Sequence, residues 1–248
     1  MSETTPTVVL IHGAFADASS WNGVITRLQA GGIAVTAPPN PLRGIAHDSD
    51  YAASVFEQIE GPVLAVGHSY GGAVITNAAN EAKNVVGLVY VAAFAPDEGE
   101  ALGAVEAGSK DSVLNSALVP RRYPNGDGAS ATEFYIDPAR AREAFAGDLT
   151  DEQASLIAAT QRPVAEAAFS EPNGPPAWNH LPSWAVVATG DKAAGTDVVR
   201  SMAERAGAKI TEVEGSHVIM ISQPQTVTDV ILEALASVGS ETMAGTTA

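Results

Sequence analysis

Residues 67–71 read Gly-His-Ser-Tyr-Gly and match the pattern G-x-S-x-G, with a serine between two glycines. An apolar run precedes this pentapeptide and a helical pattern follows it, which is the context that the pattern requires. In such a turn the serine has a strained backbone, and small neighbours prevent clashes as the chain folds back. We therefore predict that Ser69 is a nucleophile and that the backbone N–H of Tyr70 stabilises developing negative charge.

A nucleophilic serine needs a base, and the chain offers five histidines. His217 follows the last predicted strand and precedes the last predicted helix. In a parallel sheet this loop opens at the carboxyl ends of the strands, on the same rim as Ser69. We therefore predict His217 as the base. The other four are predicted to pack structurally or to lie on the surface: His12, His47, His68 and His180.

The base in turn needs a carboxylate that orients it, expected between nucleophile and base along the chain. Asp191 directly follows a strand predicted over residues 184–189, so it reaches the same rim, and we predict it as the acid. Asp97 and Glu98 follow the fourth predicted strand and stay open as alternatives. Asp197 is interpreted as the cap of the helix that starts after it.

An oxyanion needs a second backbone donor besides Tyr70. The segment 12–15 follows the first predicted strand, so its N–H groups also face the rim. Ala14 is the better candidate in this segment, and Phe15 is the alternative.

These residues need a scaffold, and short β-branched runs that alternate with helical patterns supply one. Strands are predicted over residues 7–13, 33–38, 61–69, 85–94, 184–190 and 208–215. Helices are predicted over residues 21–30, 48–59, 71–80, 198–206 and 224–237. This alternation predicts βαβ units, an α/β fold and a mostly parallel central sheet flanked by helices.

The alternation breaks between the fourth and fifth strands. Residues 95–182 show no convincing buried strand, and helices are suggested at 138–145, 150–159 and 163–168. Thr150 and Gln153 form a capping box for the second of these helices. We therefore predict an α/β core over residues 1–94 and 183–238, with a helical cap over 95–182. The small, polar residues 239–248 are predicted to be a flexible tail.

The composition of the chain argues against several kinds of binding partner and binding site. The chain of 248 residues has 46% hydrophobic residues and a formal net charge of −16, from 29 acidic and 13 basic side chains. This charge argues against nucleic acids and anionic membranes as partners. Because cysteine is absent, disulfides and thiolate metal sites are excluded. The N-terminus shows no secretory signal and no apolar run reaches the length of a membrane span, so a cytoplasmic protein is expected.

The motifs together resemble the α/β-hydrolase fold over nearly the whole chain. They are "HGAFADASSW", "GHSYGG", "TGDK" and "GSHVIMISQP". Within that fold the chain is most similar to the branch of plant methyl esterases, hydroxynitrile lyases and small bacterial esterases. The resemblance implies Ser69 as nucleophile, Asp191 as acid, His217 as base and Ala14 with Tyr70 as the oxyanion pair. It also implies that the insertion is a cap over the pocket.

Three departures from related proteins bear on the reaction. The plant lyases carry a lysine after the base and a threonine in the first loop, where this chain has Val218 and Ala14. Cyanohydrin cleavage therefore loses its proton-handling groups. Haloalkane dehalogenases have an aspartate in place of Ser69. Related hydrolases usually have a proline-containing turn after the acid, whereas this chain has the looser sequence "KAAGTD" after Asp191.

We expect hydrolysis of a small to medium, fairly hydrophobic carboxylic ester or lactone through an acyl-enzyme, without a metal or organic cofactor. Phe15 and Trp178 are candidate substrate contacts. A small-ligand receptor with a vestigial triad, a cofactor-free dioxygenase, and a C–C hydrolase or lyase remain alternatives. The oligomeric state stays open, with homodimers common among such relatives.

Overall fold

A parallel six-stranded sheet forms the centre of the computed structural model, which describes residues 5–126 and 128–245. Its strand order is β2-β1-β3-β4-β8-β9. The strands are β1 Thr7–Ile11, β2 Val35–Thr36, β3 Val63–His68, β4 Val85–Val91, β8 Ser183–Ala188 and β9 Lys209–Val213. β3 and β8 are buried at every residue, as expected for strands covered on both faces. The predicted α/β fold is thus confirmed.

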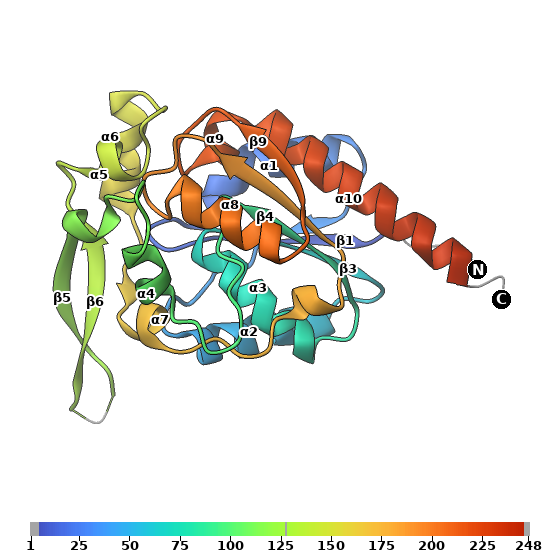
Figure 1. Ribbon diagram of the computed structural model, residues 1–248, viewed down its shortest axis with the longest axis horizontal. Helices are drawn as coiled ribbons and strands as arrows, with labels where there is room; N and C mark the ends of the chain where they lie inside the picture. Colours follow the sequence, from blue (N-terminus) through green and yellow to red (C-terminus); the bar gives the residue numbers. More distant parts are fainter. Residues whose placement is uncertain (1–4, 127, 246–248) are drawn as a thin grey trace.

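Helices cover both faces of this sheet. They are η1 Ala18–Trp21, α1 Asn22–Ala30, α2 Ile45–Glu57, α3 Tyr70–Glu81, α8 Thr196–Arg205, α9 Ile219–Ser222 and α10 Pro224–Gly245. α1 and α10 pack together on one face, and α2 and α3 pack together on the other (Figure 1). α10 buries its predicted apolar stripe, which includes Val227, Ile231 and Ala234. The helix continues to Gly245, beyond residue 239, where the sequence predicts a flexible tail to begin, and residues 246–248 lie outside the described part of the chain.

Residues 95–182, here called the inserted segment, connect β4 to its sheet neighbour β8. Their elements are α4 Leu102–Ala107, η2 Leu114–Ala117, β5 Leu118–Pro124, β6 Ser130–Ile136, α5 Ala141–Ala144, α6 Asp151–Thr160, β7 Val164–Ala165, α7 Ala167–Ser170 and η3 Ala177–Asn179. The part of the segment from α4 to α7 lies at the end of the molecule away from the protruding end of α10 (Figure 1). The predicted capping box of α6 is confirmed, because Thr150 Oγ1 accepts from the Gln153 amide at 3.2 Å.

The inserted segment, predicted as a helical cap, contains a sheet as well as helices. β5, β6 and β7 form a three-stranded antiparallel sheet, and β7 with α7 occupies the stretch predicted as one helix over 163–168. The apolar signal of a buried strand is missing because β5 is mostly exposed and contains two prolines. Cation–π contacts stabilise the hairpin instead: the Arg121 guanidinium lies 4.4 Å from the centroid of the Tyr135 ring on the paired strand.

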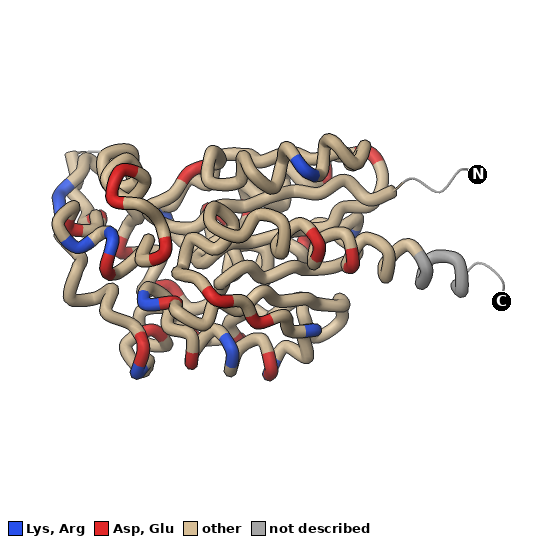
Figure 2. Tube along the Cα trace, turned by 90° about the horizontal axis from the view of Figure 1, so that it is seen from above, with Lys and Arg blue, Asp and Glu red and all other residues tan. Residues whose placement is uncertain are grey.

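Acidic residues are spread along the trace of the chain, with fewer basic residues among them (Figure 2). This distribution fits the net charge of −16. Within residues 5–126 and 128–245, no helix has both the length and the hydropathy that a membrane span needs.

Candidate active site

Ser69 lies in the sharp turn between β3 and α3, with the backbone angles φ 54° and ψ −123°. A positive φ is costly for a residue with a side chain, and it persists only where the surroundings impose it. Here the Ser69 carbonyl accepts hydrogen bonds from the amides of Gly72 at 2.9 Å and Phe94 at 3.2 Å, and its own amide donates to the Val91 carbonyl at 3.3 Å. The ends of β3 and β4 thus hold the serine in a strained conformation.

Both glycines of the G-x-S-x-G pattern are required by close backbone packing. A Cβ on Gly71 would lie 2.4 Å from the carbonyl oxygen of Ile11, at the end of β1. A Cβ on Gly67 would lie 2.5 Å from the carbonyl oxygen of Gly71 itself. Side chains at these positions would force α3 away from the sheet and displace Ser69 with it.

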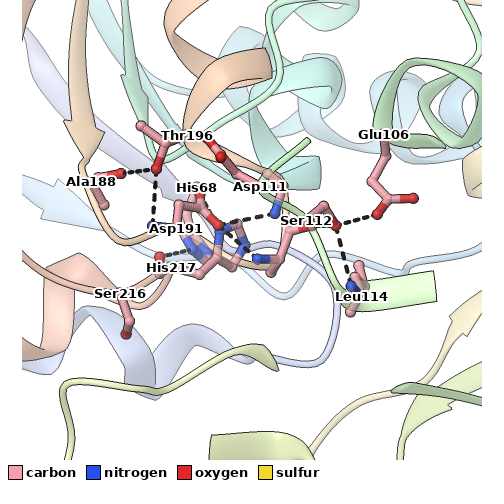
Figure 3. Close-up of polar contacts among 12 residues, drawn as sticks. His68, Glu106, Asp111, Ser112, Leu114, Ala188, Asp191, Thr196, Ser216 and His217 are labelled. Carbon is pink, nitrogen blue, oxygen red and sulfur yellow. Dashed lines mark hydrogen bonds and ion pairs between the residues drawn. The ribbon is translucent and has the colours of Figure 1, made fainter. Parts of the chain in front are cut away.

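His217 and Asp191 form a buried hydrogen-bonded pair. His217 Nδ1 lies 2.8 Å from Asp191 Oδ2, and each side chain is 1% exposed (Figure 3). A carboxylate only accepts hydrogen bonds, so Nδ1 carries the proton and Nε2 is left with a free lone pair. The other carboxylate oxygen of Asp191 accepts from the amides of Ala193 at 2.9 Å and Ala194 at 3.0 Å. Asp191 therefore orients the imidazole and is itself held by its own loop.

The rival carboxylates lie elsewhere. The Asp97 carboxylate accepts from the Glu98 amide at 2.8 Å, and neither residue forms a hydrogen bond with His217. Asp197 is not the helix cap that the sequence suggests, because Gly195 is the N-cap of α8. The Asp197 carboxylate instead accepts from Ser109 Oγ in the inserted segment at 2.5 Å.

His68 supports the base from the core. It is fully buried, and its Nε2 donates to the backbone carbonyl of His217 at 3.0 Å. The two imidazole rings lie 4.7 Å apart between centroids. Burial lowers the pKa of His68 well below its usual value, and the neighbouring His217 acts in the same direction. A neutral His68 therefore fixes the loop of the base, as its predicted structural role requires.

His12 supports the loop after β1. Its Nδ1 donates to the Gly13 carbonyl at 2.9 Å, and its Nε2 accepts from the Asn40 amide at 2.9 Å. Burial lowers its pKa to about 4. The predicted role of His12 as a support for this loop is confirmed.

The loop after β1 also runs alongside Ser69. A Cβ on Gly13 would lie 2.6 Å from the Ser69 Cβ. The Phe15 amide donates to the Arg162 carbonyl at 3.1 Å, so it is already used. The amides of Ala14 and Tyr70, in contrast, donate a hydrogen bond to no acceptor in the described part of the chain. Two free donors therefore flank the serine.

The hydrogen bond expected between the nucleophile and the base is not formed in this structure. Among the described residues, Ser69 Oγ forms no hydrogen bond with His217, although His68, its chain neighbour, contacts that residue. Such bonds commonly tighten only in complexes with substrate. Ser69 itself is buried, with 6% of its surface exposed.

Phe145 of the inserted segment lies over the histidine. Its ring centroid is 5.1 Å from that of His217 and 6.1 Å from that of Phe15. On one side of Phe145 is a cavity of about 320 Å³, with an apolar lining that includes Phe15, Leu149, Leu156, Ile157, Val218 and Ile221. On the other side is a cavity of about 600 Å³, lined by charged side chains that include Arg142, Glu143, Asp148, Lys192 and Glu214. Phe145 thus lines both an apolar and a charged compartment and packs on the base, whereas Ser69 and His217 themselves line neither compartment.

The aromatic residues suggested by the sequence are placed differently. Phe15 lines the apolar cavity, but Trp178 lines neither compartment. The Trp178 indole donates to the Pro96 carbonyl at 3.1 Å. The Tyr70 side chain points into the core, where its hydroxyl donates to Asp48 at 2.8 Å. Sequence reasoning missed Phe145, since a single aromatic at the end of a short predicted helix gives no sign of its partner.

A family model described as the alpha/beta hydrolase family matches residues 8–230. Solved structures with the same architecture include polyneuridine aldehyde esterase, with a TM-score of 0.77, 21% identity and coverage of 93% of this chain and 99% of that chain. A pyrethroid hydrolase from Sphingobium faniae matches with a TM-score of 0.76, 21% identity and coverage of 94% and 98%.

An extracellular alpha/beta-hydrolase from a Paenibacillus species, described as homologous to tobacco salicylic acid binding protein 2, has a TM-score of 0.71, 19% identity and coverage of 92% and 98%. No curated protein sequence gives a significant match. At these identities the solved structures establish the fold. The family model, which spans most of the residues, shows that the chain belongs to the alpha/beta hydrolase family.

Proposed function

We propose that this protein is a serine hydrolase that cleaves small, neutral carboxylic esters or lactones through an acyl-enzyme. The observation that carries the proposal is the buried pair of Asp191 and His217, whose hydrogen bond leaves the Nε2 lone pair of His217 free to take a proton. A strained serine, a correctly oriented imidazole and two free amides are the parts that acyl transfer needs.

In the proposed mechanism Ser69 attacks the substrate carbonyl while His217 Nε2 takes its proton. Asp191 stabilises the imidazolium that forms, without itself being protonated. The amides of Ala14 and Tyr70 donate to the oxyanion, and removing one such donor typically costs about 3 kcal/mol in the barrier. His217 then protonates the leaving alcohol. In the second half of the reaction His217 takes a proton from water, which attacks the acyl-enzyme, and the carboxylic acid is released as Ser69 takes the proton back.

The apolar cavity supports a substrate of limited size. Its volume of about 320 Å³ lies near the lower end for small-molecule sites. Among the described residues that line it, the only charged side chain is Asp17, so a carboxylate on the substrate would be repelled. A short acyl or alkyl chain, or a small ring, fits this lining best. We further propose that the inserted segment acts as the cap of the site, over a core formed by residues 1–94 and 183–238.

A panel of p-nitrophenyl esters, from acetate to octanoate, tests the proposal, with Ser69→Ala as the control. The wild-type protein should turn over the short neutral esters, and Ser69→Ala should lose this activity while keeping its circular dichroism spectrum and melting temperature. Substantial turnover by Ser69→Ala would contradict the assigned nucleophile. Failure of the wild-type protein to hydrolyse any ester or lactone would contradict the proposed reaction.

A further inference from the structure

The inserted segment is bonded to the loop that carries Asp191. Ser112 lies beside the loop of Asp191 (Figure 3). Its Oγ donates to the carbonyl of Ala193 at 2.7 Å, and the Val113 amide donates to the carbonyl of Lys192 at 2.9 Å. The Asp191 carboxylate accepts from the amides of Ala193 and Ala194, which share their peptide groups with the carbonyls of Lys192 and Ala193. Each peptide that holds the acid in place is therefore itself held from the inserted segment.

A second set of hydrogen bonds joins the inserted segment to Asp197, a few residues after the loop of Asp191. The Asp197 carboxylate accepts from Ser109 Oγ at 2.5 Å and from the Lys110 amide at 2.9 Å. In return, the Asp197 amide donates to the Asp111 carboxylate at 3.0 Å. This loop lacks the proline turn usual in related hydrolases, and these reciprocal bonds supply a restraint of comparable kind from outside the loop.

Glu106 completes the hydrogen bonding of Ser112. The Ser112 hydroxyl has one hydrogen but two acceptors in reach, the Ala193 carbonyl and the Glu106 carboxyl group. If Glu106 is protonated, it donates to Ser112 and accepts from the Asn115 amide group, and the hydroxyl hydrogen is free for Ala193. Burial raises the pKa of Glu106, which favours this arrangement. The Ser112 hydroxyl and both oxygens of the Glu106 carboxyl group then all have hydrogen-bond partners.

The inserted segment holds the base as well. Ser216, next to His217 in the chain, donates its hydroxyl to the Asp148 carboxylate, and the Phe145 ring packs on the imidazole. A Cβ on Gly215 would lie 2.7 Å from Asp148 Oδ2, so the carboxylate is in direct contact with this turn.

We propose that Ser112 and Asp148 are positioning residues of the inserted segment. They hold Asp191 and His217 in the correct position relative to each other. This inference rests on the proposed function. The two loops leave the sheet at different strands, β8 and β9, and the inserted segment is bonded to both. The inserted segment is then part of the catalytic scaffold, because loosening either contact lets the acid and the base move relative to each other.

The kinetic test uses Ser112→Ala, Asp148→Ala and their combination. Small misplacements of catalytic groups reduce rates steeply, so we expect each single change to lower kcat about tenfold or more while KM changes less than about twofold. Asp148→Asn keeps an acceptor for Ser216 and should restore most of the rate. Glu106→Gln mimics a protonated carboxyl group toward Ser112 and should stay close to wild type, whereas Glu106→Ala should not.

Asn173→Ala is the matched control. Asn173 is a buried residue of the inserted segment that accepts from Asn77 on α3, at 2.8 Å, away from the acid and base loops. Its loss should lower the melting temperature as much as the test variants do and leave kcat unchanged. If kcat of Ser112→Ala and Asp148→Ala stays within twofold of wild type, or if Asn173→Ala loses the same rate, the proposal is overturned.

A second readout does not depend on turnover. The Nδ1 proton in the bond between His217 and Asp191 should give a low-field proton resonance, identified by its loss in His217→Gln. We expect this resonance to weaken or shift in Ser112→Ala and Asp148→Ala but not in Asn173→Ala. If ester turnover is absent but the resonance responds in this way, the proposed function fails and the positioning role stands. A resonance that is unchanged in both test variants contradicts the positioning role, whatever the activity.

Discussion

The core and the inserted segment both contact the catalytic loops, but by different kinds of contact. The core holds Ser69 through backbone hydrogen bonds at the ends of β3 and β4, and it holds the carbonyl of His217 through the fully buried His68. The inserted segment holds the neighbouring residues through two side chains, with Ser112 on Ala193 and Asp148 on Ser216, and through one amide, that of Val113 on Lys192. Main-chain contacts at strand ends cannot change without moving the sheet, whereas single side chains can be lost one at a time.

This difference predicts two classes of variant. Changes in the core should abolish the reaction or the fold, and changes in the inserted segment should reduce the rate in steps. The following experiments test that division, from the largest expected effect to the smallest.

The largest effect is expected at the acid. In Asp191→Asn the amides of Ala193 and Ala194 retain the one remaining oxygen, so an NH2 group replaces the acceptor that faces His217 Nδ1. Loss of the correct tautomer in such a triad lowers kcat by about 10⁴. The measurement is kcat on p-nitrophenyl butyrate. Asp97→Asn is the matched control, since Asp97 lies in the loop after β4 without a bond to His217, and its kcat should equal that of wild type. A larger loss in Asp97→Asn would reassign the acid.

The packing of α3 on the sheet should give the largest effect on stability. In Gly71→Ala the new Cβ meets the Ile11 carbonyl oxygen, and overpacking of this kind costs about 3 kcal/mol in the free energy of unfolding. Urea denaturation measures the change. Gly239→Ala in α10 is the control, because in the described part of the chain no atom beyond the adjacent helix backbone lies within 4 Å of a Cβ there. Helix propensity should make this variant more stable by about 1 kcal/mol. Equal effects at both sites would argue against close packing at the turn between β3 and α3.

Acid should destabilise the core through its buried histidines. The pKa of His12 falls from 6.5 in the unfolded chain to about 4 in the folded protein, so the unfolded state binds more protons between these values. The stabilisation is fully present above pH 6.5 and is lost as pH falls toward 4, by about 3 kcal/mol for a change of this size. Denaturation at pH 7, 6 and 5 measures it, and His12→Asn should show a shallower dependence. An identical dependence in both proteins would contradict this role for His12.

The smallest effect is expected in the apolar cavity. Ile157→Trp narrows it, so kcat/KM for the octanoate ester should fall about tenfold relative to that for the acetate ester, the size typical of discrimination between apolar groups. Leu232→Trp adds the same ring at an exposed position on α10 and should leave this ratio unchanged. A ratio unaffected by Ile157→Trp would mean that the acyl chain binds elsewhere, and the charged compartment beyond Phe145 would be the next candidate.

The sequence predicts the core parts of this arrangement well. Ser69, Asp191 and His217 each follow a strand, and the carboxyl ends of parallel strands meet at one rim, so short-range patterns are sufficient to bring Asp191 and His217 together. The motif glycines and the alternation of strands and helices are local signals of the same kind.

The contacts of the inserted segment could not be predicted in this way. Ser112 and Ala193 are 81 residues apart in the chain, and Asp148 and Ser216 are 68 apart. These are ordinary polar residues without a motif or a period, and their partners are decided by how the segment folds back on the core. The same applies to β5, which is mostly exposed and contains two arginines, and to β6, which is mostly half-buried, so that neither strand gives a clear apolar pattern.

Covalent labelling of Ser69 tests the central claim most directly. The protein is treated with an alkyl fluorophosphonate, and the intact mass and the modified peptide are determined by mass spectrometry. The account predicts a single adduct, located on Ser69, absent in Ser69→Ala and formed far more slowly in His217→Gln, with loss of esterase activity in proportion to labelling. An adduct on another residue, or ester hydrolysis that persists after complete labelling of Ser69, would contradict it.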